Sequence, residues 1–127
     1  MTTLADHNLR ILRGNRVLIA DDDPDFRLLL RTHLEAHGFI VVGEASNGAH
    51  AISMAFKKDP DFLTLDSRMP HVGGEQALEH IAEIRPRTQV VVVSGTVERQ
   101  PEWADVFVSK MDLDTIGPLL QKMREAG

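Results

Sequence analysis

The sequence predicts an α/β protein in which helices cover both faces of a five-stranded parallel sheet, a doubly wound arrangement. Two observations lead to this prediction. Short apolar runs rich in β-branched residues alternate with segments of helical periodicity along most of the chain. Proline, glycine and asparagine stand at the boundaries between these segments. Strands and helices that alternate in this way form right-handed crossovers and a parallel sheet.

The composition is that of one ordinary globular domain. The chain has 127 residues, of which 43% are hydrophobic and 26% are charged, enough for a single core. It has no cysteine, which excludes disulfides and thiolate metal sites, and we expect a cytoplasmic protein. No apolar run approaches the ~20 residues that span a bilayer, so no membrane partner is expected. The net charge of −5 gives no basic footprint for direct binding of nucleic acid.

Five segments are predicted as strands because they are short, apolar and free of internal proline. In chain order they are Val17–Ala20, Phe39–Glu44, Asp61–Asp66, Thr88–Ser94 and Val106–Val108. The fourth is the richest in β-branched residues and is expected to be central. Residues 1–15 carry no clear period and are interpreted as an N-terminal extension.

The first predicted helix follows the first strand. Asp23 is its expected N-cap, and Pro24 stands in its first turn, where a proline costs no hydrogen bond. Gly38 is expected to end the helix. Its inward face is predicted to carry Phe26, Leu30 and Leu34, with Leu29 beside them.

Three further helices are predicted after the second, third and fifth strands. The second begins at Asn47 and stops at Asp59-Pro60, and the third spans Glu75–Ile84. In the last helix, Pro118 is tolerable only within the first turn. The apolar residues assigned to these three helices are Ile52, Ala55 and Phe56; Leu78, Ile81 and Ile84; and Leu113, Ile116, Leu120 and Met123.

The connection between the fourth and fifth strands is unusually short. The segment Thr96–Ala104 cannot hold two loops and a full helix, and Pro101 interrupts it. We therefore expect at most about one helical turn here, so that the fourth crossover helix is shortened.

Polar residues gather where the strands end. The first strand ends in Asp21, Asp22 and Asp23, the third in Asp66 and the fourth in Ser94, and Lys110 follows the fifth. Ligands of doubly wound sheets bind at this carboxyl edge. Clustered carboxylates favour a hard divalent cation such as Mg²⁺, while a lysine and a hydroxyl can neutralise a phosphoryl group. The set predicts formation of an aspartyl phosphate.

Five stretches carry a resemblance to a known family: VLIADDDPDFR, GEASNGAHA, LTLDSRMPHVGG, VVVVSG and FVSK. They resemble the receiver domain of two-component response regulators, and the spacing from Asp22 to Asp66 also matches. The resemblance covers roughly Arg16 to Met123. It implies a receiver domain over residues 16–127, with a flavodoxin-like strand order of 2-1-3-4-5.

The resemblance also implies a role for each matching residue. Asp21 and Asp22 would be the acidic pair around Mg²⁺, joined by Asp66 and by the backbone carbonyl of Arg68. Asp66 would be the phosphoacceptor and Lys110 the lysine that contacts the phosphoryl group. Ser94 would be the switch hydroxyl and Phe107 the switch aromatic.

The implied function is a signalling switch in a phosphorelay. A sensor histidine kinase or a phosphotransfer protein would donate the phosphoryl group, and the chain would slowly hydrolyse its own aspartyl phosphate without acting as an enzyme on other substrates. The resemblance leaves a homodimer open. One departure from the family is Met111, which replaces the proline that usually follows the lysine. We therefore expect the Lys110–Met111 bond to be trans, because a cis bond without proline costs ~2.5–4 kcal/mol.

Other interpretations of the same residues are less well supported. The Asp21-x-Asp23 pattern resembles the nucleophile motif of haloacid-dehalogenase-type phosphatases, but those need a longer chain and a later acidic motif. A flavin-binding domain would not place three consecutive acids after the first strand, because they would repel the phosphate of the flavin. A degenerate receiver that serves as a constant interaction surface is the more credible rival. His33 and His37 stand four residues apart, but the sequence offers no third zinc ligand for them.

Overall fold

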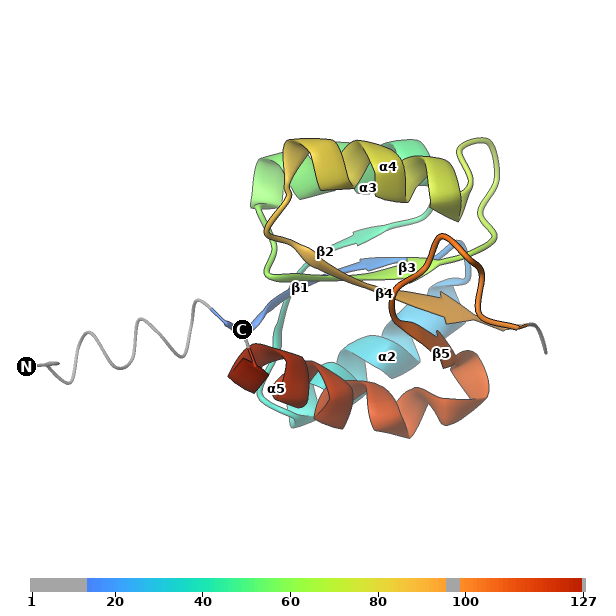
Figure 1. The fold of residues 1–127 in the computed structure, drawn as a ribbon. Coiled ribbons are helices and arrows are strands. Elements are labelled where there is room, and N and C mark those ends of the chain that lie inside the picture. The colour runs from blue at the N-terminus through green and yellow to red at the C-terminus, as the bar shows by residue number, and fades with distance from the viewer. Residues whose placement is uncertain (1–13, 96–98, 127) are drawn as a thin grey trace, which may run out of the picture.

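The computed structural model describes residues 14–95 and 99–126, which form three layers (Figure 1). A parallel five-stranded sheet with the order β2-β1-β3-β4-β5 lies between two pairs of helices. The strands are β1 (Arg16–Ala20), β2 (Ile40–Ala45), β3 (Phe62–Asp66), β4 (Gln89–Ser94) and β5 (Phe107–Ser109). The helices are α2 (Pro24–Ala36), α3 (Gly48–Lys58), α4 (Gly74–Ile84) and α5 (Ile116–Ala126), with a 3₁₀ helix, η1 (Lys110–Thr115), before α5. The predicted fold class and strand order are confirmed.

Alternation along the strands builds one core on each face of the sheet. Val17 and Ile19 of β1 point into the layer of α2 and α5, whereas Leu18 and Ala20 point into the layer of α3 and α4. All five residues of β3 are buried. The strand order places β3 in the middle of the sheet. The fourth strand, β4, lies between β3 and β5 and is thus an interior strand, as expected from its β-branched residues.

The predicted helix boundaries are confirmed by their caps. The Asp23 side chain accepts a hydrogen bond from the Asp25 N–H, and the Asn47 side chain accepts one from the His50 N–H. Gly38, just past α2, has a φ of 84°, a left-handed conformation that glycine adopts without strain. Pro118 is the third residue of α5, within the first turn.

Two apolar side chains assigned to helices lie in solvent. Leu29 and Phe56 are each 61% exposed, so the placement of Leu29 beside the inward face is wrong. Leu29 is rotated by one residue, about 100°, from Leu30 and so leaves the buried stripe. On α3, Ala51 and Ala55 are fully buried and take the close contact with the sheet.

The short connection between β4 and β5 contains no helix within residues 99–106, where a turn at Glu102 and Trp103 is the only regular feature. Positions 96–98 of the predicted irregular segment lie outside the described residues. For residues 99–104, the expectation of at most about one helical turn is confirmed. On this side of the sheet, a cavity of about 360 Å³ lies between α4, β4 and the residues just before β5. Its apolar lining includes Leu78, Ala82 and Val106.

The contact between α2 and α5 depends on two histidines. His33 Nε2 accepts a hydrogen bond of 2.9 Å from the backbone N–H of Gly117. A Cβ atom at Gly117 would lie 2.6 Å from His37 Cγ, so only glycine permits this approach. The Nδ1 of His37 lies 2.8 Å from the His33 carbonyl oxygen. Among the described residues, neither histidine belongs to a group of three metal-ligating side chains, and the zinc alternative gains no third ligand.

We predict that this contact makes stability fall in mild acid. Burial, and next the nearby His37, lower the pKa of His33 below its usual value, while Asp114 opposes the shift. Because the pKa of His33 is lower in the folded protein than in the unfolded chain, neutral His33 stabilises the fold above about pH 6.5. This contribution is lost as pH falls below that value. Protonation also removes the acceptor for Gly117, which costs about 1 kcal/mol.

Thermal unfolding between pH 7.5 and 5 measures this effect. His33→Gln should melt lower than wild type at pH 7.5, and the gap should shrink toward pH 5. His80→Gln, on the exposed face of α4, is the matched control and should follow wild type. A gap for His33→Gln that stays constant with pH would contradict the prediction.

Candidate functional site

Three carboxylates meet at the carboxyl edge of the sheet. Asp21 follows β1 and Asp66 ends β3, and both are buried, with exposed fractions of 2% and 5%. Asp22 is exposed. One oxygen of each carboxylate lies within 4.8 Å of the other two. The structure thus brings together the three acids that the sequence assigned to one metal site.

Lys110 supplies the positive charge at this edge. Its Nζ lies 2.7 Å from Asp21 Oδ2 and 3.6 Å from Asp66 Oδ2. The same nitrogen lies 4.5 Å from the centre of the Phe26 ring on α2, a cation–π contact. The Lys110–Met111 peptide bond is trans, as predicted, and the chain passes directly from β5 into η1. Lys110 therefore reaches both buried acids without the proline that is usual in the family.

Backbone groups hold the two buried carboxylates. Asp21 Oδ1 accepts a hydrogen bond of 2.9 Å from the Asp23 N–H. Asp66 Oδ1 accepts one of 3.2 Å from the Arg68 N–H. Gly74 at the start of α4 comes so close that a Cβ there would lie 2.8 Å from the Asp66 carbonyl oxygen. The Asp66 loop is therefore tightly packed against α4.

The two predicted switch residues lie on neighbouring strands. Ser94 ends β4, is 1% exposed and pairs with Ser109, the residue before Lys110. Phe107 begins β5 and is half-buried. Ser94 thus belongs to the edge that carries the acids, whereas Phe107 lies at the other end of β5.

Two further residues shape the surroundings of Lys110, and sequence reasoning missed the part played by one of them, Phe26. Phe26 was assigned to the core from its helical period, and its contact with Lys110 gives no sequence signal of its own. Gly95 lies so close to Lys110 that a Cβ there would be 3.2 Å from Lys110 Cδ.

Burial and crowding of charge set the electrostatics of the site. Burial, followed by the charge of Asp21, raises the pKa of Asp66 to about 6, against the opposing effects of the Arg68 N–H and Lys110. Burial works to lower the pKa of Lys110, but its hydrogen bond to Asp21 and the charge of Asp66 outweigh this and raise it. Lys110 alone thus leaves the acidic cluster under-neutralised.

The donor set fits a hard divalent cation. Three carboxylates against one ammonium leave an excess of two negative charges, and all the candidate ligand atoms are oxygens. Mg²⁺ prefers oxygen ligands and usually binds through a few carboxylates together with water. The residues that would hold it are Asp21, Asp22 and Asp66, with the Arg68 carbonyl as a further candidate ligand.

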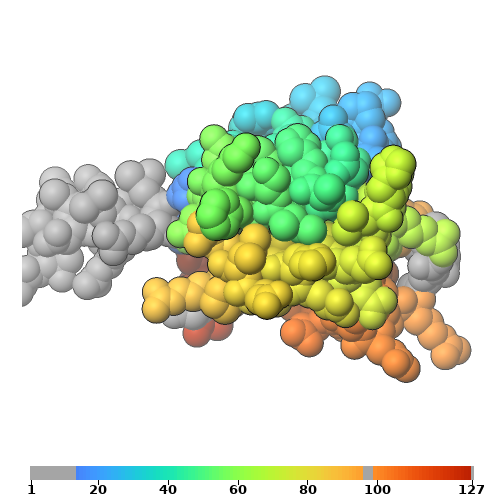
Figure 2. All heavy atoms as spheres, turned by 90° about the horizontal axis from the view of Figure 1, so that it is seen from above, coloured from blue at the N-terminus to red at the C-terminus, as the bar shows by residue number. Residues whose placement is uncertain are grey.

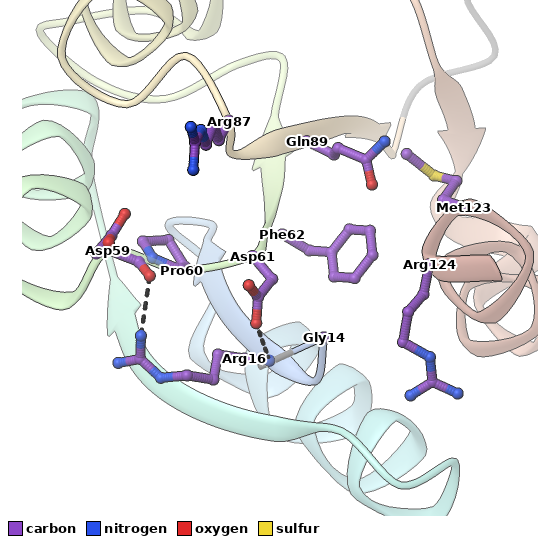
Figure 3. A pocket seen from close by; sticks show the side chains of 10 residues that line it. All are labelled: Gly14, Arg16, Asp59, Pro60, Asp61, Phe62, Arg87, Gln89, Met123 and Arg124. Atoms are coloured by element: carbon purple, nitrogen blue, oxygen red, sulfur yellow. Dashed lines mark hydrogen bonds between the residues drawn. The ribbon is translucent and has the colours of Figure 1, made fainter. Parts of the chain in front are cut away.

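A larger cavity, of about 750 Å³, lies at the opposite end of the sheet (Figure 3). Its rim combines arginines with acids that already have partners. Asp61 accepts a hydrogen bond from the Arg16 N–H, and the Arg16 guanidinium donates to the Asp59 carbonyl oxygen. The strands begin at this edge, whereas ligands of such sheets bind where strands end. The acidic cluster is therefore the stronger functional candidate.

Comparison with known proteins identifies the family. The profile of the response regulator receiver domain matches residues 17–112, so the chain belongs to this family of phosphoacceptor signalling domains. It is 37% identical over 82 residues to the chemotaxis protein CheY of Thermotoga maritima, covering 65% of this chain and 68% of that protein. The chain is thus similar to the receiver domains of two-component response regulators, which signal and are not catalysts by themselves.

Solved structures agree with this assignment. The response regulator domain of Thermotoga maritima CheB superposes with a TM-score of 0.74 at 27% identity, covering 88% of this chain and 94% of that one. Thermotoga maritima TrrA, solved in complex with Mg²⁺-BeF, gives a TM-score of 0.77 at 24% identity, covering 86% and 98% of the two chains. The second likeness concerns the fold alone.

Several relatives are much longer than the matched region. The chain is 40% identical over 80 residues to a Pseudomonas aeruginosa protein named as a transcriptional regulator, covering 63% of this chain and 39% of that protein. A protein-glutamate methylesterase of Hahella chejuensis is 44% identical over 80 residues, but only 23% of its length is covered. Their full activities therefore do not transfer to this chain.

None of the helices in residues 14–95 and 99–126 has the length and apolar character needed to cross a membrane.

We predict that removing the charge of Asp66 stabilises the metal-free protein. The pKa of Asp66 in the folded protein is about 6, raised from 3.8, so the contribution of this carboxyl to stability is greatest below pH 4 and is lost as pH rises through 6. At pH 7.5 in chelator, Asp66→Asn should therefore melt higher than wild type, with a gain of about 1–3 kcal/mol. The gain should vanish toward pH 4.

Asp22→Asn provides a second test of the same repulsion. It should also melt higher than wild type in chelator, by less because Asp22 is exposed, and it should lose Mg²⁺ binding. Differential scanning calorimetry with and without Mg²⁺ measures both effects. If both variants melted lower than wild type in chelator, the three carboxylates would not be a source of repulsion.

Proposed function

We propose that this chain accepts a phosphoryl group on Asp66 in a Mg²⁺-dependent reaction, from a sensor histidine kinase or a phosphotransfer protein. One observation carries the proposal. The buried carboxylate of Asp66 shares its edge of the sheet with Asp21 and Asp22, and Lys110 Nζ lies 3.6 Å from it. A nucleophilic oxygen, candidate cation ligands and a positive charge are thus within reach of one phosphoryl group.

The transfer exchanges one bond to phosphorus for another. An oxygen of ionised Asp66 attacks phosphorus, the P–O bond forms, and the P–N bond to the donor histidine breaks, leaving that histidine with the electron pair. With a pKa of about 6, Asp66 is mostly ionised at pH 7.5 even without metal. The chemistry that a bound Mg²⁺ supplies is withdrawal of charge from the phosphoryl oxygens.

Lys110 and Ser94 are proposed to hold the transferred group. The Lys110 stem is flexible, so its ammonium can move from Asp21 toward a phosphoryl group on Asp66. The Ser94 hydroxyl, at the end of the neighbouring strand, would donate a hydrogen bond to it. Phe107, on the next strand β5, would be the switch aromatic: its side chain would move when Asp66 is phosphorylated and so alter the surface of the domain. Slow hydrolysis of the aspartyl phosphate would then reset the domain.

The receiver domain is proposed to span residues 16–127.

The donor of the phosphoryl group is proposed to be a protein in the cytoplasm. Exposed apolar side chains on two elements next to the site support docking of a protein donor. These are Leu28 and Leu29 on α2, which are 64% and 61% exposed, and Met111, which follows Lys110 and is 82% exposed. No direct contact of this chain with nucleic acid is proposed.

We predict that wild type incubated with acetyl phosphate and Mg²⁺ gains one phosphoryl group by intact mass. Asp66→Asn should gain none, because the attacking oxygen is gone, and wild type in chelator should gain little. Asp59→Asn, at the opposite edge of the sheet, is the matched control and should label like wild type. Equal labelling of wild type and Asp66→Asn would overturn the acceptor. No labelling of wild type would favour a degenerate receiver that acts as a constant interaction surface.

A further inference from the structure

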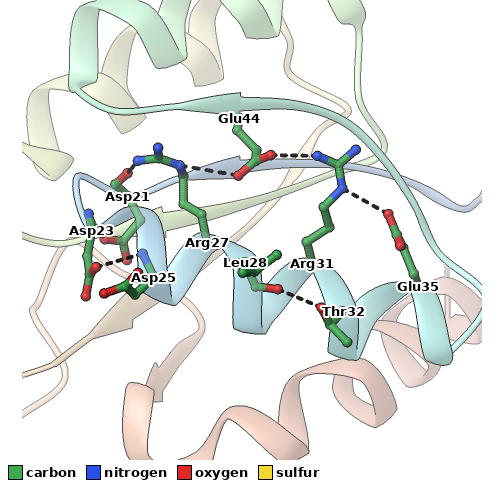
Figure 4. A network of polar contacts seen from close by, with 9 residues as sticks. All are labelled: Asp21, Asp23, Asp25, Arg27, Leu28, Arg31, Thr32, Glu35 and Glu44. Carbon is green, nitrogen blue, oxygen red and sulfur yellow. Dashed lines mark hydrogen bonds and ion pairs between the residues drawn. The ribbon is translucent and has the colours of Figure 1, made fainter.

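The segment that carries Asp21 and Asp22 is held from the side of α2 by Arg27 (Figure 4). The Arg27 Nη1 donates a 2.7 Å hydrogen bond to the backbone carbonyl oxygen of Asp21. Its Nε lies 3.3 Å from Glu44 Oε1 on β2. One guanidinium thus joins the end of β1, the helix α2 and the strand β2. The side chain is only 19% exposed, which shields these contacts from water.

A second arginine completes the network without contacting the acidic cluster. Arg31, one turn further along α2, has Nη1 2.6 Å from Glu44 Oε2 and Nε 2.9 Å from Glu35 Oε1. Within residues 14–95 and 99–126, it has no hydrogen bond to Asp21. Two positive and two negative side chains make the network neutral. Arg31 therefore offers a matched control, because it shares Glu44 with Arg27 but not the contact with Asp21.

The carbonyl of Asp21 controls where two carboxylates point. Asp21 lies just past Ala20, the last paired residue of β1, and its N–H donates to the Ala45 carbonyl oxygen at 2.9 Å. Its own carbonyl belongs to the planar peptide group that links it to Asp22. Fixing this plane limits the direction of the Cα–Cβ bonds on both sides. Without Arg27, the carbonyl of the buried residue Asp21 loses this donor and the peptide plane is free to turn.

We propose that Arg27 is a positioning residue for the Mg²⁺ site: it holds the Asp21 carbonyl and thereby aims the carboxylates of Asp21 and Asp22 at the cation, while Glu44 fixes the guanidinium. This inference rests on the proposed function and deepens it. Simple electrostatics gives the opposite expectation, because removing a positive charge near a cation site should tighten cation binding. The sign of the change in affinity therefore separates positioning from charge.

Isothermal titration calorimetry of Mg²⁺ into the metal-free full chain is the test. Arg27→Met should bind Mg²⁺ about tenfold more weakly than wild type, a typical loss when a residue supporting a metal ligand is removed. Arg31→Met should stay within about twofold, because exposed ion pairs contribute little. Arg27→Lys keeps the charge but has one ammonium for two partners, so its affinity should lie between those of Arg27→Met and wild type.

A kinetic measurement adds a readout that a general loss of stability would not produce. The Mg²⁺ concentration for half-maximal labelling of Asp66 should rise about tenfold in Arg27→Met, while the rate at saturating Mg²⁺ stays close to wild type. Melting temperatures of the two Met variants in chelator identify any shared loss of folding stability.

The outcomes separate this inference from the proposed function. If wild type itself does not bind Mg²⁺, both fall together. If wild type binds Mg²⁺ but Arg27→Met binds as tightly or more tightly, the positioning role of Arg27 is overturned and the metal site stands. Equal weakening in Arg27→Met and Arg31→Met would also overturn it, because the effect would then belong to Glu44 and not to the Asp21 carbonyl.

Discussion

Repulsion among buried carboxylates is the constraint around which this domain is organised. Parallel pairing brings Ala20 beside Leu65, so the residues that follow them, Asp21 and Asp66, necessarily meet at one edge of the sheet. Both are almost fully buried, where like charges interact strongly. The apolar layers on the two faces of the sheet must hold this arrangement together, because Lys110 neutralises only part of it. A site whose carboxylates repel one another is well suited to bind a cation and then a phosphoryl group.

The position of Lys110 follows from the same imbalance. Its ammonium is nearer to Asp21, at 2.7 Å, than to the proposed acceptor Asp66, at 3.6 Å. A divalent cation held by Asp21 would therefore compete with Lys110 for the oxygens of this carboxylate. Its charge would weaken the hold of Asp21 on the ammonium, and a phosphoryl group on Asp66 would offer Lys110 a stronger partner. The trans peptide bond at Met111 does not prevent this, because the flexible stem of Lys110 provides the reach.

The features that the sequence predicted are those set by chain order and local pattern. Strand periodicity and the caps at Asp23 and Asn47 located the elements, and parallel topology was enough to bring the acids together. What could not be predicted depends on how each helix is rotated and how closely it approaches its neighbour. The exposure of Leu29 and the contact between His33 and Gly117 are of this kind, since the pattern of apolar residues tolerates rotations that change individual contacts.

The helix α2 links the parts of the site that the strands do not connect. At its N-terminal end, the Phe26 ring lies under the ammonium of Lys110, and Arg27 holds the carbonyl of Asp21. Two turns later, His33 accepts the N–H of Gly117 at the start of α5. Lys110 begins η1, which leads directly into α5, so the same helix contacts both ends of the segment that carries the lysine. A displacement of Lys110 toward Asp66 would therefore have to be accommodated against a helix that also holds the carbonyl of Asp21, which would tie the position of the lysine to the geometry of the proposed cation site.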